Sequence, residues 1–262
     1  MNINDLSTQL LYTTVPIYAK KNDGSLSSGT GFMFSVREDN ETSIPLLITN
    51  YHVLENTIAG FVELHIGENG LPTDRSTRIQ FDNSIIGSNK LGNLDLVAVP
   101  MAATLMDLQN KNIDIFFRSV DQKMIPTSEQ LESFSAIENV TFIGYPSGLY
   151  DEKNKISIIR QGITATPIWN NFRGEQAFLI DAGVFPGTSG SPVFIYNQGA
   201  YPVKDGIAMG NRLLFVGIIS QTMLRDNMTG KNFLNLGKVI NSKAMYYELD
   251  KFIQKLKAGN NQ

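Results

Sequence analysis

Short apolar segments with a period of two fill most of this chain. In residues 29–36, Phe32, Phe34 and Val36 alternate with smaller or polar neighbours, which is typical of a β-strand with one buried face. Residues 44–49 are almost continuously apolar, as expected of a fully buried strand. Gly, Asn and Pro separate these segments and mark turns. The pattern therefore indicates a protein built mainly from short strands.

The predicted strands fall into two groups. Further strands are expected at residues 15–18, 61–66, 78–81, 93–100, 140–146, 156–167, 176–185, 192–196 and 213–220. Residues 101–135 lose the alternation and are expected to form a connection with some helix or turn. Because Pro16 has no ladder donor, we expect residues 15–18 to form an edge strand. Two groups of about six short strands favour a β-sandwich or barrel architecture.

The end of the chain changes to a helical period. One helical face carries Met245, Leu249, Phe252, Ile253 and Leu256. Asn241 or Ser242 can cap the start of this helix, and Gly259 can end it. The opposite face carries both acidic residues and lysines, which favours a terminal helix docked on the strands. The alternative is a helix that binds a partner or a membrane surface.

Composition excludes several classes of function. The chain has 262 residues, no Cys and a net charge of −3. Disulfides, thiolate zinc sites and Cys nucleophiles are therefore excluded, and there is no general basic field to support nucleic-acid binding. No apolar run approaches the length of a membrane span, and the N-terminus has no signal-peptide pattern. A cytoplasmic location is predicted, with secretion only if a leader was removed.

A glycine-flanked serine turn is the first candidate for chemistry. Ser189 lies between Gly187 and Gly190, in a turn that joins two apolar runs. Glycine permits positive φ and the close approach of a second backbone segment, which gives a nucleophile access. The amides of Gly187 and Ser189 can also converge on one point and stabilise a developing oxyanion. Taken alone, most turns of this kind have no catalytic role. In addition, Ser needs a base to act as a nucleophile.

His52 and Asp95 can supply that base and the acid that orients it. The chain has only two His. His65 shares a strand face with Glu63 and is interpreted as a solvated histidine, whereas His52 stands at the end of the apolar run 44–49. Asp95 interrupts another apolar strand, where a buried carboxylate needs a partner. Alone, His52 is explained as a core histidine and Asp95 as an acid on a polar strand face. Together with Ser189 they have the residue types and the chain order of a chymotrypsin-type triad.

Four segments strengthen this interpretation. They are Gly29-Thr30-Gly31-Phe32, Ile48-Thr49-Asn50-Tyr51-His52-Val53, Asn93-Leu94-Asp95-Leu96-Val97, and the D-A-x-x-x-P-G-x-S-G-x-P pattern from Asp181 to Pro192. Phe142-Ile143-Gly144-Tyr145-Pro146 and Val216-Gly217-Ile218-Ile219-Ser220 add two strand motifs. In this order the segments resemble the chymotrypsin-fold (trypsin-like) serine proteases. Within this family, the segments most resemble those of the bacterial, disulfide-free branch that includes HtrA/Deg proteases and glutamyl endopeptidases.

The resemblance implies a fold and a division of the chain. The fold is all-β, with two six-stranded antiparallel β-barrels and a C-terminal α-helix in a single peptidase domain over residues 1–262. The expected parts are an N-terminal barrel at about 9–105 with His52 and Asp95, a connection at 106–135, a C-terminal barrel at 136–237 with Ser189, and a helix at 241–258.

The resemblance also implies a mechanism. Ser189 attacks a peptide or ester carbonyl, His52 acts as base and then as acid, and Asp95 orients His52. The Gly187 and Ser189 amides form the oxyanion hole, and water hydrolyses an acyl-enzyme. No cofactor and no metal is implied.

Departures from the family pattern concern activation and specificity. Thr188 and Ser191 replace the commoner Asp or Asn and Gly, and zymogen activation by N-terminal cleavage is not expected. The expected substrate-binding residues are Gly183, Ser220, Gln221 and Thr222. Because Gly183 places no acid at the base of the specificity pocket, a small or uncharged residue is expected before the cleaved bond.

The leading hypothesis is a serine endopeptidase that acts on a restricted set of polypeptide substrates. A regulatory protein partner is a further expectation, while nucleic acid and membrane are not expected as partners. The alternative from another class is a catalytically silent or partner-activated binding module on the same fold. Esterase activity of the same triad is a third interpretation.

Overall fold

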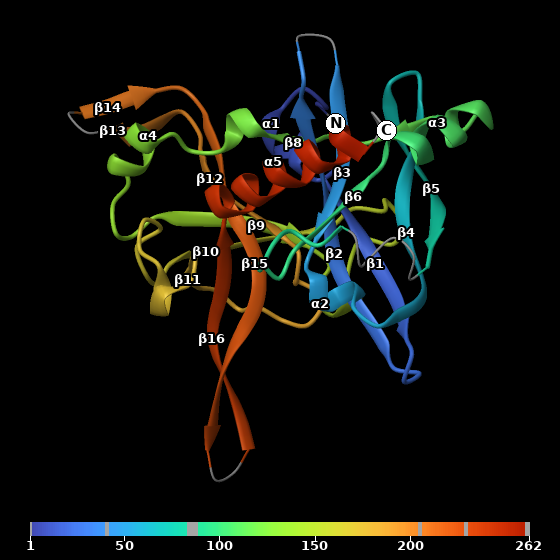
Figure 1. Cartoon of the computed structure of the whole chain (residues 1–262). Coiled ribbons are helices and arrows are strands. Elements are labelled where there is room, and N and C mark those ends of the chain that lie inside the picture. The colour runs from blue at the N-terminus through green and yellow to red at the C-terminus, as the bar shows by residue number, and fades with distance from the viewer. Residues whose placement is uncertain (1, 40–41, 83–88, 204–205, 228–229, 260–262) are drawn as a thin grey trace.

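The structure is a computed structural model that describes residues 2–39, 42–82, 89–203, 206–227 and 230–259. Strands dominate it, and two β-systems lie side by side with one long helix across them (Figure 1). Two short helices accompany the N-terminal half, α1 (Leu6–Leu10) and α2 (Tyr51–Leu54). The family-like fold expected from the sequence is therefore present, although its two halves differ.

The N-terminal half forms an eight-stranded sheet. Its main path runs β5-β4-β1-β2-β3-β6, with β7 on β4 and β8 on β2. The strands are β1 (Thr14–Lys21), β2 (Leu26–Arg37), β3 (Ser43–Thr49), β4 (Thr57–Glu68), β5 (Leu71–Phe81), β6 (Val97–Pro100), β7 (Ile115–Phe116) and β8 (Val120–Asp121). In the described residues the path is open between β5 and β6, and β2 pairs with β8 in parallel. The prediction of two six-stranded antiparallel barrels is therefore not met by this half as stated.

The C-terminal half forms a closed six-stranded barrel in the order β10-β11-β16-β15-β12-β9. Its strands are β9 (Asn139–Gly144), β10 (Ile158–Thr164), β11 (Ala177–Asp181), β12 (Pro192–Asn197), β15 (Arg212–Asn227) and β16 (Gly230–Asn241). All six pairings around the barrel are antiparallel. This closure confirms one of the two expected barrels.

Two hairpins project from the barrel (Figure 1). One is the outer part of β15 and β16, which extends well beyond the barrel wall. The other joins β13 (Ala200–Val203) and β14 (Gly206–Met209) as a separate two-stranded sheet. The sequence analysis placed no strand at β16, β13 or β14.

The connection between the halves contains little regular structure. It holds α3 (Ala102–Asn110), the strands β7 and β8, a 3₁₀ turn η3 (Gln122–Met124) and α4 (Ser128–Glu132). Thr127 caps α4 through a capping box with Gln130, which explains why so short a helix forms there. The C-terminal half contains two further 3₁₀ turns. The turn η4 (Pro146–Gly148) follows β9, and η5 (Phe172–Gly174) precedes β11.

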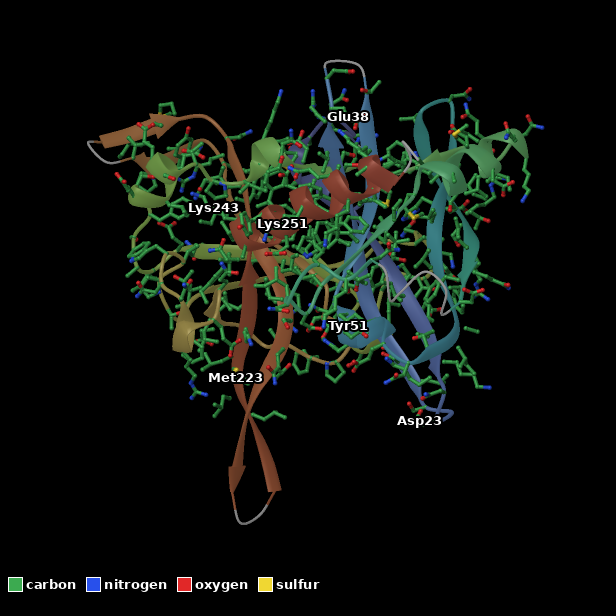
Figure 2. All side chains as sticks on the ribbon, in the orientation of Figure 1. Asp23, Glu38, Tyr51, Met223, Lys243 and Lys251 are labelled. Atoms are coloured by element: carbon green, nitrogen blue, oxygen red, sulfur yellow. The ribbon has the colours of Figure 1, made fainter. Side chains whose placement is uncertain are left out.

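Helix α5 (Ser242–Gly259) covers the seam between the two β-systems (Figure 1). One continuous core contains Phe32 and Phe34 from the sheet, Ile143, Phe194 and Phe215 from the barrel, and Met245, Leu249, Phe252 and Ile253 from the helix. The opposite face of α5 is charged, and Lys251 pairs there with Glu248 at 3.0 Å (Figure 2). The apolar helical face is thus occupied by the body of the protein, as docking requires. None of the helices in the described ranges is both long and apolar enough to cross a membrane.

Two local predictions were wrong. Strand β1 is not an edge strand, since it lies between β2 and β4. Proline has no N–H to donate, but pairing with β4 begins only at Ile17, so no ladder bond to β4 is lost at Pro16. On the other side Pro16 lies opposite Thr30 of β2, whose N–H donates to the Ser189 carbonyl and not to β1. His65 is not solvated, since only 6% of it is exposed and its ring meets the edge of Tyr12.

Candidate active site

The position of His52 follows from the end of a buried strand. The apolar strand β3 stops at Thr49, and the short helix α2 then carries His52 at its second position. The backbone carbonyl of Asp95 accepts hydrogen bonds from the Asn50 side chain at 2.8 Å and from the Tyr51 amide at 3.2 Å. The turn that presents His52 is therefore tied directly to the loop that carries Asp95.

The carboxylate of Asp95 holds the imidazole. Its Oδ2 lies 2.7 Å from His52 Nδ1, and its Oδ1 accepts the His52 backbone N–H at 3.0 Å. Ser220 Oγ donates a third hydrogen bond to Oδ2 at 2.9 Å. Burial alone would raise the pKa of Asp95, but the His52 ring, the His52 amide and the Ser220 hydroxyl together lower the pKa below its ordinary value. The carboxylate is thus ionised and can fix the ring with Nδ1–H toward Asp95 and Nε2 free.

The turn around Ser189 is clamped between the two β-systems. The N–H of Thr30 on β2 donates to the Ser189 carbonyl at 2.8 Å, and the Gly190 N–H donates to Ile219 on β15 at 2.8 Å. Gly190 has φ of +90°, and a Cβ there would overlap the Thr30 carbonyl oxygen. Only glycine therefore fits at this position.

The Ser189 hydroxyl lies on the side of β15. Its Oγ donates to the Ser220 carbonyl at 3.4 Å. Among the contacts of the described residues, no hydrogen bond joins Ser189 to His52. Catalytic hydrogen bonds are often long or misaligned in ligand-free enzymes and tighten with substrate, and Oγ can be redirected by rotation about one side-chain bond.

Two backbone amides beside Ser189 are available to a ligand. Within the described part of the chain, neither Gly187 N–H nor Ser189 N–H donates to another protein group. The peptide plane before Gly187 is fixed, because the Pro186 carbonyl accepts from Ser147 N–H at 2.5 Å. The plane after it is fixed by Thr30 Oγ1, which donates to the Gly187 carbonyl at 2.8 Å. Free donors held in this way are what an oxyanion hole requires.

The two residues that depart from the family pattern are both buried. Thr188 Oγ1 donates to the Phe185 carbonyl at 2.5 Å and so closes the turn on itself. The Ser191 hydroxyl is buried and has no hydrogen-bond partner among the described residues. Thr188 therefore stabilises the turn without an ion pair.

Of the predicted substrate-binding residues, Ser220 contacts Ser189 directly through its carbonyl, and Gln221 is exposed. Thr222 Oγ1 donates to the Val184 carbonyl at 3.0 Å, which joins β15 to the segment before the serine turn. A Cβ at Gly183 would lie 2.9 Å from Arg160 Nη2 and 3.2 Å from the Phe185 ring. The surface at Gly183 is therefore closely covered by the Arg160 and Phe185 side chains.

Three residues that shape the site were not singled out from the sequence. Thr30 contacts the serine turn through its amide and its hydroxyl, and Ser147 holds Pro186. Lys21 Nζ donates to the His52 carbonyl at 2.9 Å and to the Glu55 carbonyl at 2.5 Å. The motif Gly29-Thr30-Gly31-Phe32 could have drawn attention to Thr30. Ser147 and Lys21 act through contacts with residues distant in the sequence, and no local pattern marks them. The described residues contain no group of three or more His, Asp or Glu arranged to hold a metal ion.

Comparisons with solved structures give the same fold. The structure of the HtrA-type protease AlgW with a tripeptide, in a serine-to-alanine variant, matches with a TM-score of 0.54 and 15% identity, over 97% of this chain and 64% of that one. An inactive form of Rv3671c from M. tuberculosis matches with a TM-score of 0.51 and 14% identity, over 96% and 91%. The serine endoprotease from Yersinia pestis matches with a TM-score of 0.51 and 18% identity, over 97% and 67%.

These identities show the fold alone, and the chain spans less than two thirds of the AlgW chain it matches. No curated protein sequence matches. The family model of the trypsin-like peptidase domain matches residues 29–200, which is well over half of the chain and includes all three candidate catalytic residues. The chain therefore belongs to the trypsin-like peptidase domain family.

Proposed function

We propose that this chain is a serine endopeptidase that works through His52, Asp95 and Ser189. The observation that carries the proposal is the 2.7 Å contact of His52 Nδ1 with Asp95, next to a serine turn with two free amides. His52 Nε2 takes the proton of Ser189 as Oγ attacks the peptide carbonyl, and Asp95 stabilises the imidazolium. The oxyanion is held by the Gly187 and Ser189 amides.

The second half of the reaction uses the same groups. His52 gives its proton to the leaving amine, and the acyl group stays on Ser189 as an ester. Water, deprotonated by His52, then attacks this ester and releases the acid. Ser220, Gln221 and Thr222 on β15 are proposed to pair with the substrate backbone on the acyl side. The bridge from Thr222 to Val184, together with Gly183, supports a small residue before the cleaved bond.

We also propose that substrates are a restricted set of polypeptides and that a protein partner controls activity. Rapid degradation of unfolded casein by the purified protein alone would contradict this restriction.

The deciding experiment is covalent labelling with a fluorophosphonate probe. Wild type is expected to be labelled, while Ser189→Ala and His52→Ala are not, because the probe reacts only with a serine that a base activates. His65→Gln is the matched control, since it removes the other histidine and leaves the candidate triad intact.

A second candidate function is a silent or partner-activated module. The hydrogen bond from Ser189 Oγ to Ser220, in place of one to His52, favours it. A folded wild type that resists labelling even with substrate-like peptides present would support this candidate.

A further inference from the structure

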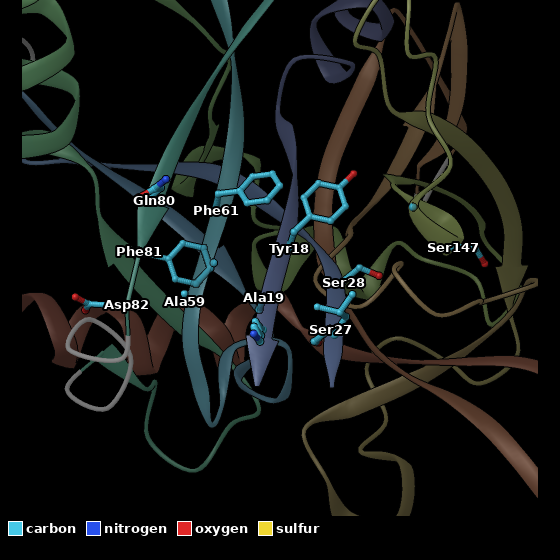
Figure 3. Close-up of a pocket in the computed structure, with 14 residues that line it drawn as sticks. Tyr18, Ala19, Ser27, Ser28, Ala59, Phe61, Gln80, Phe81, Asp82 and Ser147 are labelled. Atoms are coloured by element: carbon cyan, nitrogen blue, oxygen red, sulfur yellow. The ribbon is translucent and has the colours of Figure 1, made fainter. Parts of the chain in front are cut away.

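An open apolar groove lies on the outer surface of the N-terminal sheet (Figure 3). Its volume is about 950 Å³, which is at the upper end for ligand-binding clefts. Tyr18 on β1, Leu26 on β2, and Phe61 and Phe81 on β4 and β5 supply its apolar lining. We refer to this feature as the aromatic groove.

The lining of the aromatic groove is built by specific packing. Tyr18 and Phe61 are stacked with ring centroids 4.9 Å apart. Gly60 has no side chain, and a Cβ there would overlap Phe81, so this glycine lets the Phe81 ring lie over β4. Leu26 is 84% exposed at the rim. Such an exposed leucine beside an aromatic floor is typical of a surface that buries apolar groups of a ligand.

Two contacts connect the aromatic groove to the serine turn. Ser147 and Gly148 line one end of it, and Ser147 N–H holds the carbonyl of Pro186, directly before the Gly187 amide. Ser28 lines the rim, two residues before Thr30, whose N–H donates to the Ser189 carbonyl at 2.8 Å. These residues place one end of the groove next to the serine turn.

A third contact places the aromatic groove on the side of His52. Lys20 lines it, and the next residue, Lys21, donates to the His52 carbonyl at 2.9 Å. In the proposed reaction His52 protonates the leaving amine, so the leaving part of the substrate lies on the His52 side. The acyl part is assigned to Ser220–Thr222 on β15, which do not line the groove.

We propose that the aromatic groove binds the substrate segment that follows the cleaved bond and selects apolar or aromatic side chains there. The inference rests on the proposed function, because it assigns the direction of the substrate from the role of His52. Its occupant is one extended polypeptide segment, since one end of the groove lies against the serine turn, where a Cβ at Gly187 would be 3.3 Å from the Gly148 nitrogen, and its lining is mostly apolar. Substrates are then selected by the residues that follow the cleaved bond as well as by the residue that precedes it.

The first test measures binding without turnover. Peptides that carry Phe and Leu, or Ser and Asn, after the cleaved position are titrated into Ser189→Ala by fluorescence anisotropy. The apolar peptide is expected to bind about tenfold more tightly, and Leu26→Ser in the same background is expected to remove most of this difference. Leu71→Ser is the matched control, because Leu71 is a 53% exposed leucine of the same sheet outside the groove. Equal binding of the two peptides would overturn the proposal.

The second test separates the groove from the catalytic assignment. Leu26→Ser is expected to lower kcat/KM about fivefold to tenfold for quenched peptides with apolar leaving segments. Activity on an ester without a leaving peptide should not change. Equal losses on both substrates would overturn the groove proposal while the catalytic proposal stands. A change of oligomeric state in Leu26→Ser with unchanged peptide binding would assign the groove to self-association and overturn it too.

Discussion

The Asp95 carboxylate receives three hydrogen bonds, two from His52 and one from Ser220. All three require an acceptor, so the carboxylate suits this place and an amide does not. The lowered pKa of Asp95 has the same origin, because these donors outweigh the cost of its burial. At this scale the site depends on one ionised side chain that determines which nitrogen of His52 carries the proton.

Asp95→Asn is therefore expected to keep the fold and lose activity. The amide would present its N–H₂ toward Nδ1 and favour the wrong tautomer of His52, which costs about 10⁴-fold in kcat in Ser-His-Asp triads. Peptide cleavage and the rate of fluorophosphonate labelling measure this loss. Asp107→Asn, an exposed change on α3, serves as the control. Labelling of Asp95→Asn at the wild-type rate would exclude Asp95 from the proposed triad.

Thr222 is expected to limit the residue that precedes the cleaved bond. Its hydroxyl donates to the Val184 carbonyl and so holds β15 close to the segment that leads to Ser189, which limits the space between them. Thr222→Gly should open this space and raise kcat/KM for Phe over Ala before the bond by more than about tenfold, since burying an aromatic side chain contributes about 2 kcal/mol. Thr222→Ser keeps the hydroxyl bridge and should retain the wild-type preference. Libraries of peptides varied at this one position measure the change, and an identical preference in all three proteins would contradict it.

At the scale of the elements, the conformation of some turns depends on glycines in the left-handed region of backbone conformation. Gly190 and Gly148 both have positive φ, of +90° and +73°. They differ in their surroundings, because a Cβ at Gly190 would overlap Thr30, whereas nothing lies within 4 Å at Gly148. Glycine is therefore required at position 190 by tertiary contact and by backbone conformation, and at position 148 by backbone conformation alone.

Gly190→Ala is expected to destabilise the protein by more than 3 kcal/mol or to prevent folding, because both the backbone strain and the overlap must be relieved. Gly148→Ala should cost only about 1 kcal/mol, the cost of the backbone conformation. Urea unfolding followed by circular dichroism measures both values. Similar costs at the two positions would show that Thr30 can move away from the turn.

Strands and motifs with a local signal were predictable from the sequence. Alternating residues gave β2 and β4, and the serine turn with its glycines is where the motif placed it. Strand β16 was missed because its place is fixed by pairing with β11 and β15. The interior position of β1 and the open N-terminal sheet likewise depend on which strands meet, and no local period carries that information.

At the scale of the whole molecule, α5 unites the two β-systems. Its apolar face shares one core with Phe34 of the sheet and Phe215 of the barrel. The candidate active site lies where these systems meet, since Thr30 belongs to β2 and Ser220 to β15. The helix contact and the candidate site therefore both lie at the junction of the two β-systems.

Leu249→Ala is expected to lower the free energy of unfolding by about 2–5 kcal/mol, the usual cost of a cavity in a packed core. Leu249 is fully buried, whereas Tyr247 on the same helix is 61% exposed. Tyr247→Ala should therefore change stability by less than about 1 kcal/mol. Urea unfolding of the two variants tests whether α5 is part of the cooperative unit, and a loss below 1 kcal/mol for Leu249→Ala would show that it is not.

His65 gives the whole molecule a dependence on pH. It lies on β4 against the edge of Tyr12, with Lys155 and Glu63 nearby, and its Nδ1 is buried without a hydrogen-bond partner among the described residues. Burial lowers the pKa of His65, with smaller opposing effects from backbone groups. The unfolded chain therefore binds this proton more readily than the native protein does, starting near pH 6.5.

Stability is then expected to be greatest above pH 6.5 and to fall as the pH drops from there toward the lowered pKa of His65. One proton contributes a slope of at most about 1.4 kcal/mol per pH unit. Because the chain has only two His, urea unfolding at pH 7.5 and pH 5 in a His52→Gln background isolates this effect. His65→Gln in that background should flatten the dependence, even if its stability is lower at both pH values. If the double variant keeps the full dependence of unfolding free energy on pH, this dependence comes from carboxylates. His65 would then have no part in the acid sensitivity of the fold.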